Sequence, residues 1–117
     1  MAKQVVCHAD ELPPGTRTVV RLGGRAIGVF NIDSRYYALR DVCPHQGASL
    51  CAGTVGGTML PSRPHEYVWG LEGRIVRCPW HGLEFDLENG RSLSDPDRWR
   101  VHTYPASVEN GNVVVDA

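Results

Sequence analysis

Short extended segments separated by turn residues dominate the pattern of hydrophobic and polar positions along the chain. Two apolar runs, 18–22 and 25–31, flank Gly23-Gly24, a pair that tolerates the positive φ angles of a tight hairpin turn. Asp33-Ser34 then turns the chain into an extended run over 36–40, where aromatic residues favour a half-buried strand. The first part of the chain is therefore predicted to form antiparallel strands.

Similar patterns follow further along the chain. Glu72-Gly73 lies between extended runs and predicts a second hairpin that leads into Cys78. The alternation from 101 to 115, interrupted by Asn110-Gly111, predicts a closing hairpin. Helix signals are confined to a turn at 9–12 before two prolines. These patterns, with 13 Gly and 8 Pro, indicate an all-β fold.

Length and charge narrow the possible functions. A chain of 117 residues is the size of one domain, so we expect a single domain over 1–117. The formal net charge of −1 provides no broad positive field for nucleic acid or anionic lipid. No apolar run approaches the ~20 residues of a membrane span, and the start lacks the pattern of a secretory signal. We therefore expect a cytoplasmic protein.

Two mixed Cys/His motifs carry the candidate chemistry. Cys43 and His45 form Cys-x-His, and after 32 further residues Cys78 and His81 form Cys-x-x-His. Each motif follows a predicted strand. A mononuclear zinc site could use the same four side chains, but common zinc fingers pair Cys with Cys and His with His. A dinuclear iron-sulfur centre explains the mixing, because each loop can supply a thiolate to one iron and an imidazole to the other.

The sequence at this point resembles the Rieske family, and its small soluble ferredoxins in particular. The matching segments are CPHQGASL at 43–50 and CPWHGLEFDLENG at 78–90. The resemblance implies one [2Fe-2S] cluster, with Cys43 and Cys78 on one iron and His45 and His81 on the other. It also implies the Rieske fold, an antiparallel β-sandwich base with a small cluster-binding subdomain built from loops at about 43–51 and 78–90.

The same resemblance implies a role in electron transfer and not in catalysis. Such a carrier would pass single electrons from an NAD(P)H-dependent flavin ferredoxin reductase to a terminal non-haem iron oxygenase of the ring-hydroxylating type. No catalytic iron motif of two His and one carboxylate follows the cluster motifs. Two alternatives remain open: a Rieske-type small subunit of a larger reductase, such as nitrite reductase, and a structural zinc module.

Residues outside the two motifs receive structural interpretations. The segment at about 52–66 is interpreted as an insertion, because its prolines favour a loop although Gly56-Gly57 could form a small hairpin. Cys51 is expected to be a small buried residue, and Cys7 has no partner motif. His102 is expected at a solvent-facing position of its strand. Pro96 is at the position of a third loop that covers the cluster in the family.

Three departures from the Rieske proteins of respiratory complexes predict the midpoint potential. Those proteins have a disulfide Cys, a Ser and a Tyr at three positions, and the Ser and Tyr hydroxyls hydrogen-bond the sulfurs. This sequence has Trp80 in place of the Cys, Leu83 in place of the Ser and Phe85 in place of the Tyr. Those hydrogen bonds favour the reduced state, so we expect a potential closer to about −150 mV than to about +300 mV. Redox titration followed by electron paramagnetic resonance measures it, and a midpoint clearly above zero would contradict the prediction.

Overall fold

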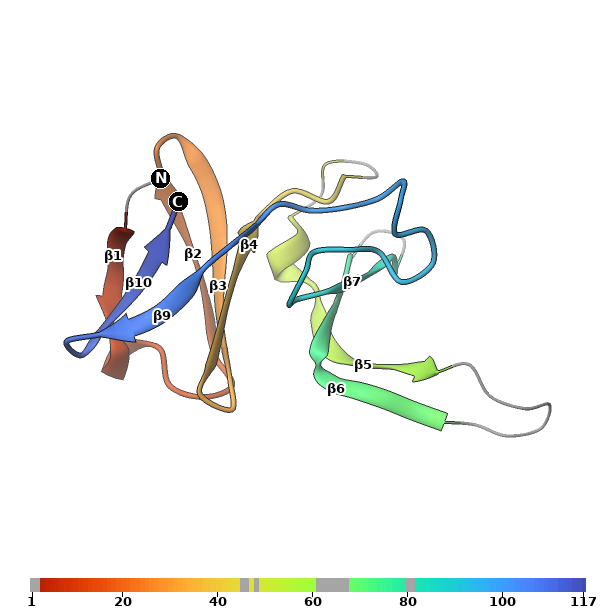
Figure 1. The fold of residues 1–117 in the computed structure, drawn as a ribbon, viewed down its shortest axis with the longest axis horizontal. Helices are drawn as coiled ribbons and strands as arrows, with labels where there is room; N and C mark the ends of the chain where they lie inside the picture. Colours follow the sequence, from red (N-terminus) through yellow and green to blue (C-terminus); the bar gives the residue numbers. More distant parts are fainter. Residues whose placement is uncertain (1–2, 45–46, 48, 61–67, 80–81) are drawn as a thin grey trace.

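In the computed structural model, the described residues form antiparallel strands in three sheets, which turns, irregular segments and two short 3₁₀ helices connect (Figure 1). The structure describes residues 3–44, 47, 49–60, 68–79 and 82–117, with the backbone alone for 57–60 and 68–72. The sheet orders are β1-β10-β9, β2-β3-β4-β8 and β5-β6-β7. The bounds are β1 Lys3–His8, β2 Arg17–Leu22, β3 Arg25–Ile32, β4 Arg35–Arg40, β5 Thr54–Leu60, β6 Val68–Arg77, β7 Glu84–Asp86, β8 Thr103–Tyr104, β9 Ala106–Glu109 and β10 Asn112–Asp116. The all-β prediction is confirmed.

Three tight turns occur where the sequence predicts them. Gly23 and Gly24 connect β2 to β3 with φ angles of 59° and 79°. Asp33 and Ser34 connect β3 to β4, also with positive φ, and Asn110-Gly111 connects β9 to β10 in the same way. Two consecutive residues with positive φ fit the right-handed twist of a hairpin, so these short local signals are sufficient to define the turns. The turn predicted at 9–12 is a 3₁₀ helix, Ala9–Glu11.

The base of the molecule is a sandwich of the sheets β1-β10-β9 and β2-β3-β4-β8. Ile27 and Val29 of β3 and Ala38 of β4 point into it and are at most 1% exposed. They pack against Val113 and Val115 of β10. Strand β1, which the sequence analysis does not predict, lies at the edge of the sandwich and pairs with β10 from Lys3↔Asp116 to His8↔Asn112.

A second core lies on the other face of the β2-β3-β4-β8 sheet. Phe30 of β3 and Leu39 of β4 alternate with the residues that face the base, and they join a cluster that contains both Cys43 and Cys78. We call this cluster the cysteine core. We call the part of the molecule that contains this cluster and the sheet β5-β6-β7 the cysteine lobe. Strand β3 is therefore buried on both faces, and the base supports the cysteine lobe directly.

The hairpin predicted at Glu72-Gly73 is wrong. Strand β6 runs without a turn through Val68–Arg77, and Gly73 has a φ of 75° inside it. The register with β5 passes from Gly56↔Ile75 to Thr58↔Gly70, so residues 71–74 form a bulge opposite Gly57. A glycine with positive φ serves a bulge as well as a turn, which explains why the local signal misleads.

The segment interpreted as an inserted loop contains regular structure. Leu50–Ala52 is a 3₁₀ helix, and β5 begins at Thr54 and continues to Leu60. Figure 1 shows β5 and β6 extending together away from the two cores. The loop interpretation of 52–66 is therefore wrong for Thr54–Leu60, while 61–66 lies outside the described residues. No helix in the described part of the chain is long and apolar enough to cross a lipid bilayer.

One close contact joins the base to the cysteine lobe and yields a prediction. A Cβ added at Gly28 of β3 would overlap with the Cys51 side chain. Gly28→Ala is expected to lower the free energy of unfolding by about 1–3 kcal/mol, because Cys51 and its neighbours must shift. Urea unfolding measures the loss. If the contact is the cause, adding Cys51→Ala makes the combined loss smaller than the sum of the two single losses, whereas simple additivity would contradict it.

Candidate metal centre

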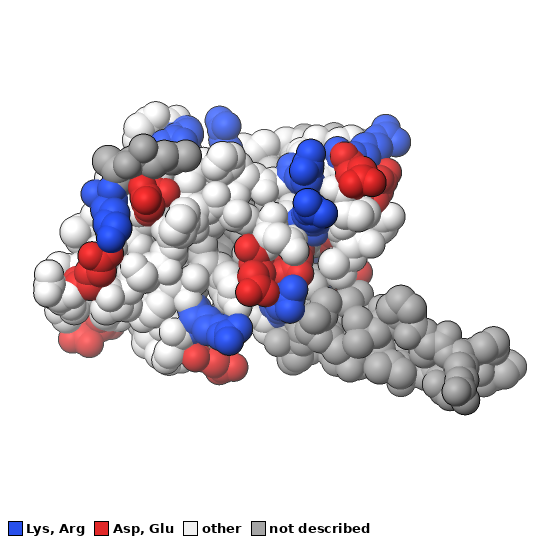
Figure 2. All heavy atoms as spheres, viewed as in Figure 1, with Lys and Arg blue, Asp and Glu red and all other residues white. Residues whose placement is uncertain are grey.

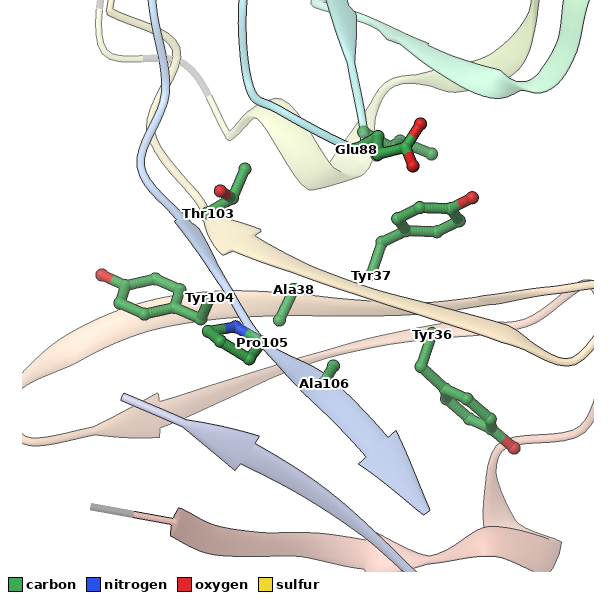
Figure 3. Close-up of a pocket in the computed structure, with 9 residues that line it drawn as sticks. Tyr36, Tyr37, Ala38, Glu88, Thr103, Tyr104, Pro105 and Ala106 are labelled. Carbon is green, nitrogen blue, oxygen red and sulfur yellow. The ribbon is translucent and has the colours of Figure 1, made fainter. Parts of the chain in front are cut away.

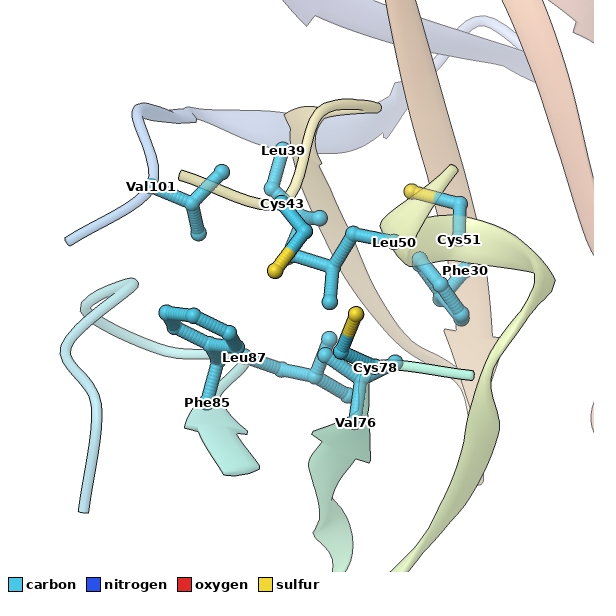
Figure 4. Packing of buried hydrophobic residues seen from close by; sticks show 10 residues of the cluster. All are labelled: Phe30, Leu39, Cys43, Leu50, Cys51, Val76, Cys78, Phe85, Leu87 and Val101. Carbon is cyan, nitrogen blue, oxygen red and sulfur yellow. The ribbon is translucent and has the colours of Figure 1, made fainter. Parts of the chain in front are cut away.

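Two buried cysteine thiols face a common space between two loops. Cys43 follows β4 and is 1% exposed, and Cys78 follows β6 and is 3% exposed. Both are free of disulfide bonds. Figure 4 shows their sulfur atoms pointing toward the region between the two loops. The structure thus brings together two of the four ligands that the sequence predicts.

The same backbone hydrogen bond occurs in both loops. The N–H of Gly47 donates to the carbonyl of Cys43 at 2.8 Å, and the N–H of Gly82 donates to the carbonyl of Cys78 at 3.0 Å. Both glycines have positive φ angles, 75° and 69°. Each loop therefore turns back on itself four residues after its cysteine, a turn that glycine permits without Cβ strain. Two equivalent turns are the arrangement expected for two loops that bind one cofactor from opposite sides.

Apolar side chains surround the thiols on the side of the protein interior. Leu39, Leu50, Phe85 and Leu87 are at most 1% exposed, and Val101 is 6% exposed. Figure 4 shows them arranged around the two cysteines. This packing keeps water away from the inner side of the sulfurs, which lowers the local dielectric and strengthens electrostatic interactions with a bound group.

Asp41 fixes the far end of the first loop. Its carboxylate accepts a hydrogen bond from the Ser49 hydroxyl at 2.8 Å and one from the Cys51 N–H at 2.8 Å. Arg17 of β2 donates to the carbonyls of Cys51 and Gly53. The loop is therefore held at both ends, by β4 before Cys43 and by Asp41 and Arg17 after it. Sequence reasoning misses these residues, because neither an isolated Asp after a strand nor an isolated Arg within one gives a signal of its partner.

Paired charges fix the second loop. The Cys78 N–H donates to the carbonyl of Leu83 at 2.8 Å, which closes the loop. Arg77 donates to Glu84 at 2.6 Å across the strand pair that carries the loop. Arg74 donates to the Asp86 carboxylate at 2.8 Å, and only 7% of that Asp86 side chain is exposed. Such a shielded bidentate pair holds β6 and β7 together more firmly than an exposed one.

The third loop, which includes Pro96, is closed by hydrogen bonds at its base. The Ser92 N–H donates to the Trp99 carbonyl at 2.9 Å, and the Val101 N–H donates to the Gly90 carbonyl at 2.8 Å. Trp99 packs against the cysteine core, while Pro96 is exposed. That this loop covers a cofactor stays a prediction.

Several predicted residues lie outside the described part of the chain. These are His45 and His81, the two proposed imidazole ligands, and also Trp80 and His65. Among the residues that the structure does describe, no group of three or more His, Cys, Asp or Glu side chains could hold a metal ion. The four-ligand assignment therefore stays a prediction, supported by the positions of its two cysteines.

The structure places Cys51 and His102 as the sequence predicts, and it also describes Cys7. Cys51 is 2% exposed and belongs to the cysteine core, as predicted for a small buried residue. Burial first, and the Asp41 carboxylate second, raise the pKa of its thiol far above the ordinary value of 9.0. Cys7 lies in β1, remote in the fold from the two loops, and His102 is exposed.

A pocket of about 360 Å³ lies where the base and the cysteine lobe meet (Figure 3). Neither Cys43 nor Cys78 is among the residues that line it, so it is distinct from the space between the two loops. Its described lining residues are Tyr36, Tyr37, Ala38, Leu87, Glu88, Thr103, Tyr104, Pro105 and Ala106.

Comparison with known families identifies the class to which this arrangement belongs. Residues 2–105 match the profile of the Rieske [2Fe-2S] domain. Since this match spans most of the chain, the protein belongs to the Rieske [2Fe-2S] family. The resemblance noted in the two motifs is confirmed, and so is the expected fold.

Similar proteins and structures agree with this class. Ferredoxin CarAc of Metapseudomonas resinovorans is 32% identical over 94% of this chain and 89% of its own. A chain from a complex of reduced oxygenase and oxidized ferredoxin in carbazole 1,9a-dioxygenase has a TM-score of 0.73 at 30% identity, covering 97% of this chain and 91% of that one. A putative nitrite reductase small subunit of Mycobacterium tuberculosis has a TM-score of 0.76 at 30% identity, over 97% and 93%. The reading as an electron-transfer protein, without catalysis of its own, is confirmed.

The raised pKa of Cys51 predicts an alkaline loss of stability. The folded protein keeps this thiol protonated, whereas the unfolded chain releases the proton as the pH rises past the ordinary pKa of 9.0. The contribution of this thiol to the free energy of unfolding is therefore complete below that pH, and it falls by about 1.4 kcal/mol per pH unit above it. Urea unfolding of the wild type and of Cys51→Ala between pH 7 and 10 measures the difference. Parallel stability curves for the two proteins would contradict the prediction.

Proposed function

We propose that this protein carries one [2Fe-2S] cluster and passes single electrons from an NAD(P)H-dependent flavin reductase to a terminal non-haem iron oxygenase. Cys43 and Cys78 would hold one iron, and His45 and His81 the other. The observation that carries the proposal is the pair of buried thiols, neither of them in a disulfide bond, on two loops that share the same backbone hydrogen bond. We further propose that 1–117 acts as one Rieske domain, with binding loops at about 43–51 and 78–90, and works in the cytoplasm.

The donor set fits this cluster on charge grounds. When bound, the cluster supplies one-electron redox chemistry. Two thiolates cancel the formal charge of about +2 on an oxidised core of two ferric ions and two sulfides, and two neutral imidazoles add none. An added electron therefore enters a site without net negative charge, which costs less Coulomb energy than in a site with four thiolates.

The residues of this chain have separate tasks in such a centre. The thiols of Cys43 and Cys78 provide the anionic ligands, while Leu39, Leu50 and Phe85 exclude water from the inner side. The hydrogen bonds to Asp41 brace the first loop, and the Arg77–Glu84 pair braces the second. A rigid frame reduces the rearrangement that accompanies each change of charge, which suits repeated electron exchange.

The relatives support one of the two proposed partners. Ferredoxin CarAc is named as a ferredoxin, and the carbazole dioxygenase structure holds an oxygenase together with a ferredoxin. This supports a terminal oxygenase as one partner of the present chain, with the reductase as the electron source. Contacts of an electron carrier with its partners are expected to be small and short-lived.

A second candidate function is that of a fixed small subunit of a nitrite reductase. The structural similarity to the putative small subunit, with a TM-score of 0.76, is as high as that to the ferredoxin complex. Both predicted histidines and both cysteines are present in this sequence, which favours a cluster-bearing carrier. Purification from the native cell distinguishes the two, because a fixed subunit elutes with a large catalytic chain and a free carrier elutes alone.

Cysteine and histidine variants of this protein test the ligand assignment. Cys43→Ala and Cys78→Ala are expected to lose nearly all iron and acid-labile sulfide and the visible absorbance of the cluster. Cys7→Ala and Cys51→Ala are the matched controls and are expected to keep two irons and two sulfides per chain. His45→Ala and His81→Ala should lose the Rieske resonance signal, while His102→Ala keeps it. One zinc per chain, or cluster loss in the control variants, would contradict the assignment.

A further inference from the structure

A groove of about 390 Å³ lies beside the loop that carries Cys43. Val42 and Pro44, the two chain neighbours of Cys43, both line it, so the groove is adjacent to a proposed iron ligand. Its other described lining residues are Arg40, Arg100, Val101 and His102. The N–H of Arg40 donates to the carbonyl of His102 at 2.9 Å, which places the end of β4 beside the segment that follows the third loop.

The groove is positively charged. Arg40 and Arg100 are exposed, and neither forms an ion pair with a residue that the structure describes. Arg91 lies opposite Arg100 in an antiparallel bridge, which places two like charges side by side. No acidic residue is among the described residues that line the groove. Figure 2 shows basic side chains on the upper part of the molecule, with acidic side chains beside some of them.

Several other charged side chains near the cysteine loops have partners in the structure. Arg74 binds Asp86, and Arg77 binds Glu84. The carboxylate of Asp41 is occupied by Ser49 and Cys51. The charged side chains that line the groove beside the first loop are both basic, although the chain as a whole carries a formal net charge of −1. An excess of one sign at one place on a nearly neutral protein orients an approaching charged partner.

We propose that this groove, lined by Arg40, Val42, Pro44 and Arg100, is the docking site for an acidic segment of an electron-transfer partner. Two guanidinium groups can each bind a carboxylate through two hydrogen bonds. Val42 is 42% exposed and adds an apolar surface to the same groove. A negative partner also relieves the repulsion between Arg91 and Arg100. The inference rests on the proposed function, since docking here matters because Cys43 holds the redox centre.

Small redox ions of opposite charge test the groove without an identified partner. The protein is reduced with dithionite, and its oxidation by ferricyanide, a trianion, or by hexaammineruthenium(III), a trication, is followed by stopped flow at about 10 mM ionic strength. One electron passes from the reduced cluster to each oxidant, giving ferrocyanide or hexaammineruthenium(II). Iron, sulfide and the visible spectrum are measured first, so that absence of the cluster is distinguished from failure of the docking proposal.

Strand β4 provides a matched control, because it begins at Arg35 and ends at Arg40. Arg40→Gln and Arg35→Gln remove the same charge from positions about 17 Å apart along one strand. Arg40→Gln is expected to slow ferricyanide about threefold and to speed the ruthenium oxidant by a similar factor. Arg40→Gln with Arg100→Gln should give about a tenfold change, and Arg35→Gln should change neither rate by more than about 1.5-fold.

The opposite responses of the two oxidants separate local charge from driving force, since a shifted midpoint would move both rates in the same direction. Equal effects of Arg35→Gln and Arg40→Gln, or no effect of the double variant, would overturn the proposal.

A second measurement uses a fluorescent hexaglutamate peptide and its anisotropy. The oxidised wild-type protein should bind it at low salt, and the double variant should bind it at least about fivefold more weakly. Equal binding by the two proteins would also overturn it.

Discussion

The close contact between Gly28 of β3 and the side chain of Cys51 determines how the two parts of the molecule fit together. Strand β3 has a core on each face, with Ile27 and Val29 toward the base and Phe30 toward the cysteine lobe. Glycine at position 28 removes the side chain where the first loop must approach the sheet. Because both cores use the same strand, the positions of the cysteine loops depend on the packing of the base.

From this shared strand, the two loops obtain their positions by different means. The first leaves β4 and is held at its end by a single carboxylate, Asp41, which binds Ser49 and the Cys51 backbone. The second leaves β6 and is held by the charge pairs Arg77–Glu84 and Arg74–Asp86. Both then turn at a glycine four residues after the cysteine. The equivalence of the loops is thus a property of the local backbone, on supports that are unlike each other.

Local signals in the sequence predicted the parts of the fold that depend on neighbouring residues. The turns at Gly23-Gly24 and Asn110-Gly111 need two adjacent residues with positive φ, and the sequence displays such pairs directly. Glu72-Gly73 gives the same signal but lies in a bulge, because β5 continues to pair on both sides of it. Strand β1 could not be predicted, since it is stabilised by β10, more than 100 positions later in the chain.

The candidate site, too, was predicted from the sequence only in part. The cysteines were found because their spacing with histidine is specific, and the structure places both thiols at one buried point. Asp41 and Arg17 were missed, because each acts through a partner that only the folded chain brings near. The basic lining of the groove beside the first loop was missed for the same reason. Only the folded chain shows that Arg74 and Arg77 are in ion pairs, whereas Arg40 and Arg100 line the groove without one among the described residues.

The pairing of β1 with β10 has a practical consequence. Lys3 lies opposite Asp116, and Figure 1 shows both ends of the chain on the base, on the side away from the cysteine loops. A tag, a linker or a surface anchor joined to either end would therefore leave the region around Cys43 and Cys78 open. The protein could be immobilised on an electrode, or fused to another polypeptide, with the end that carries Cys43 and Cys78 still directed outward.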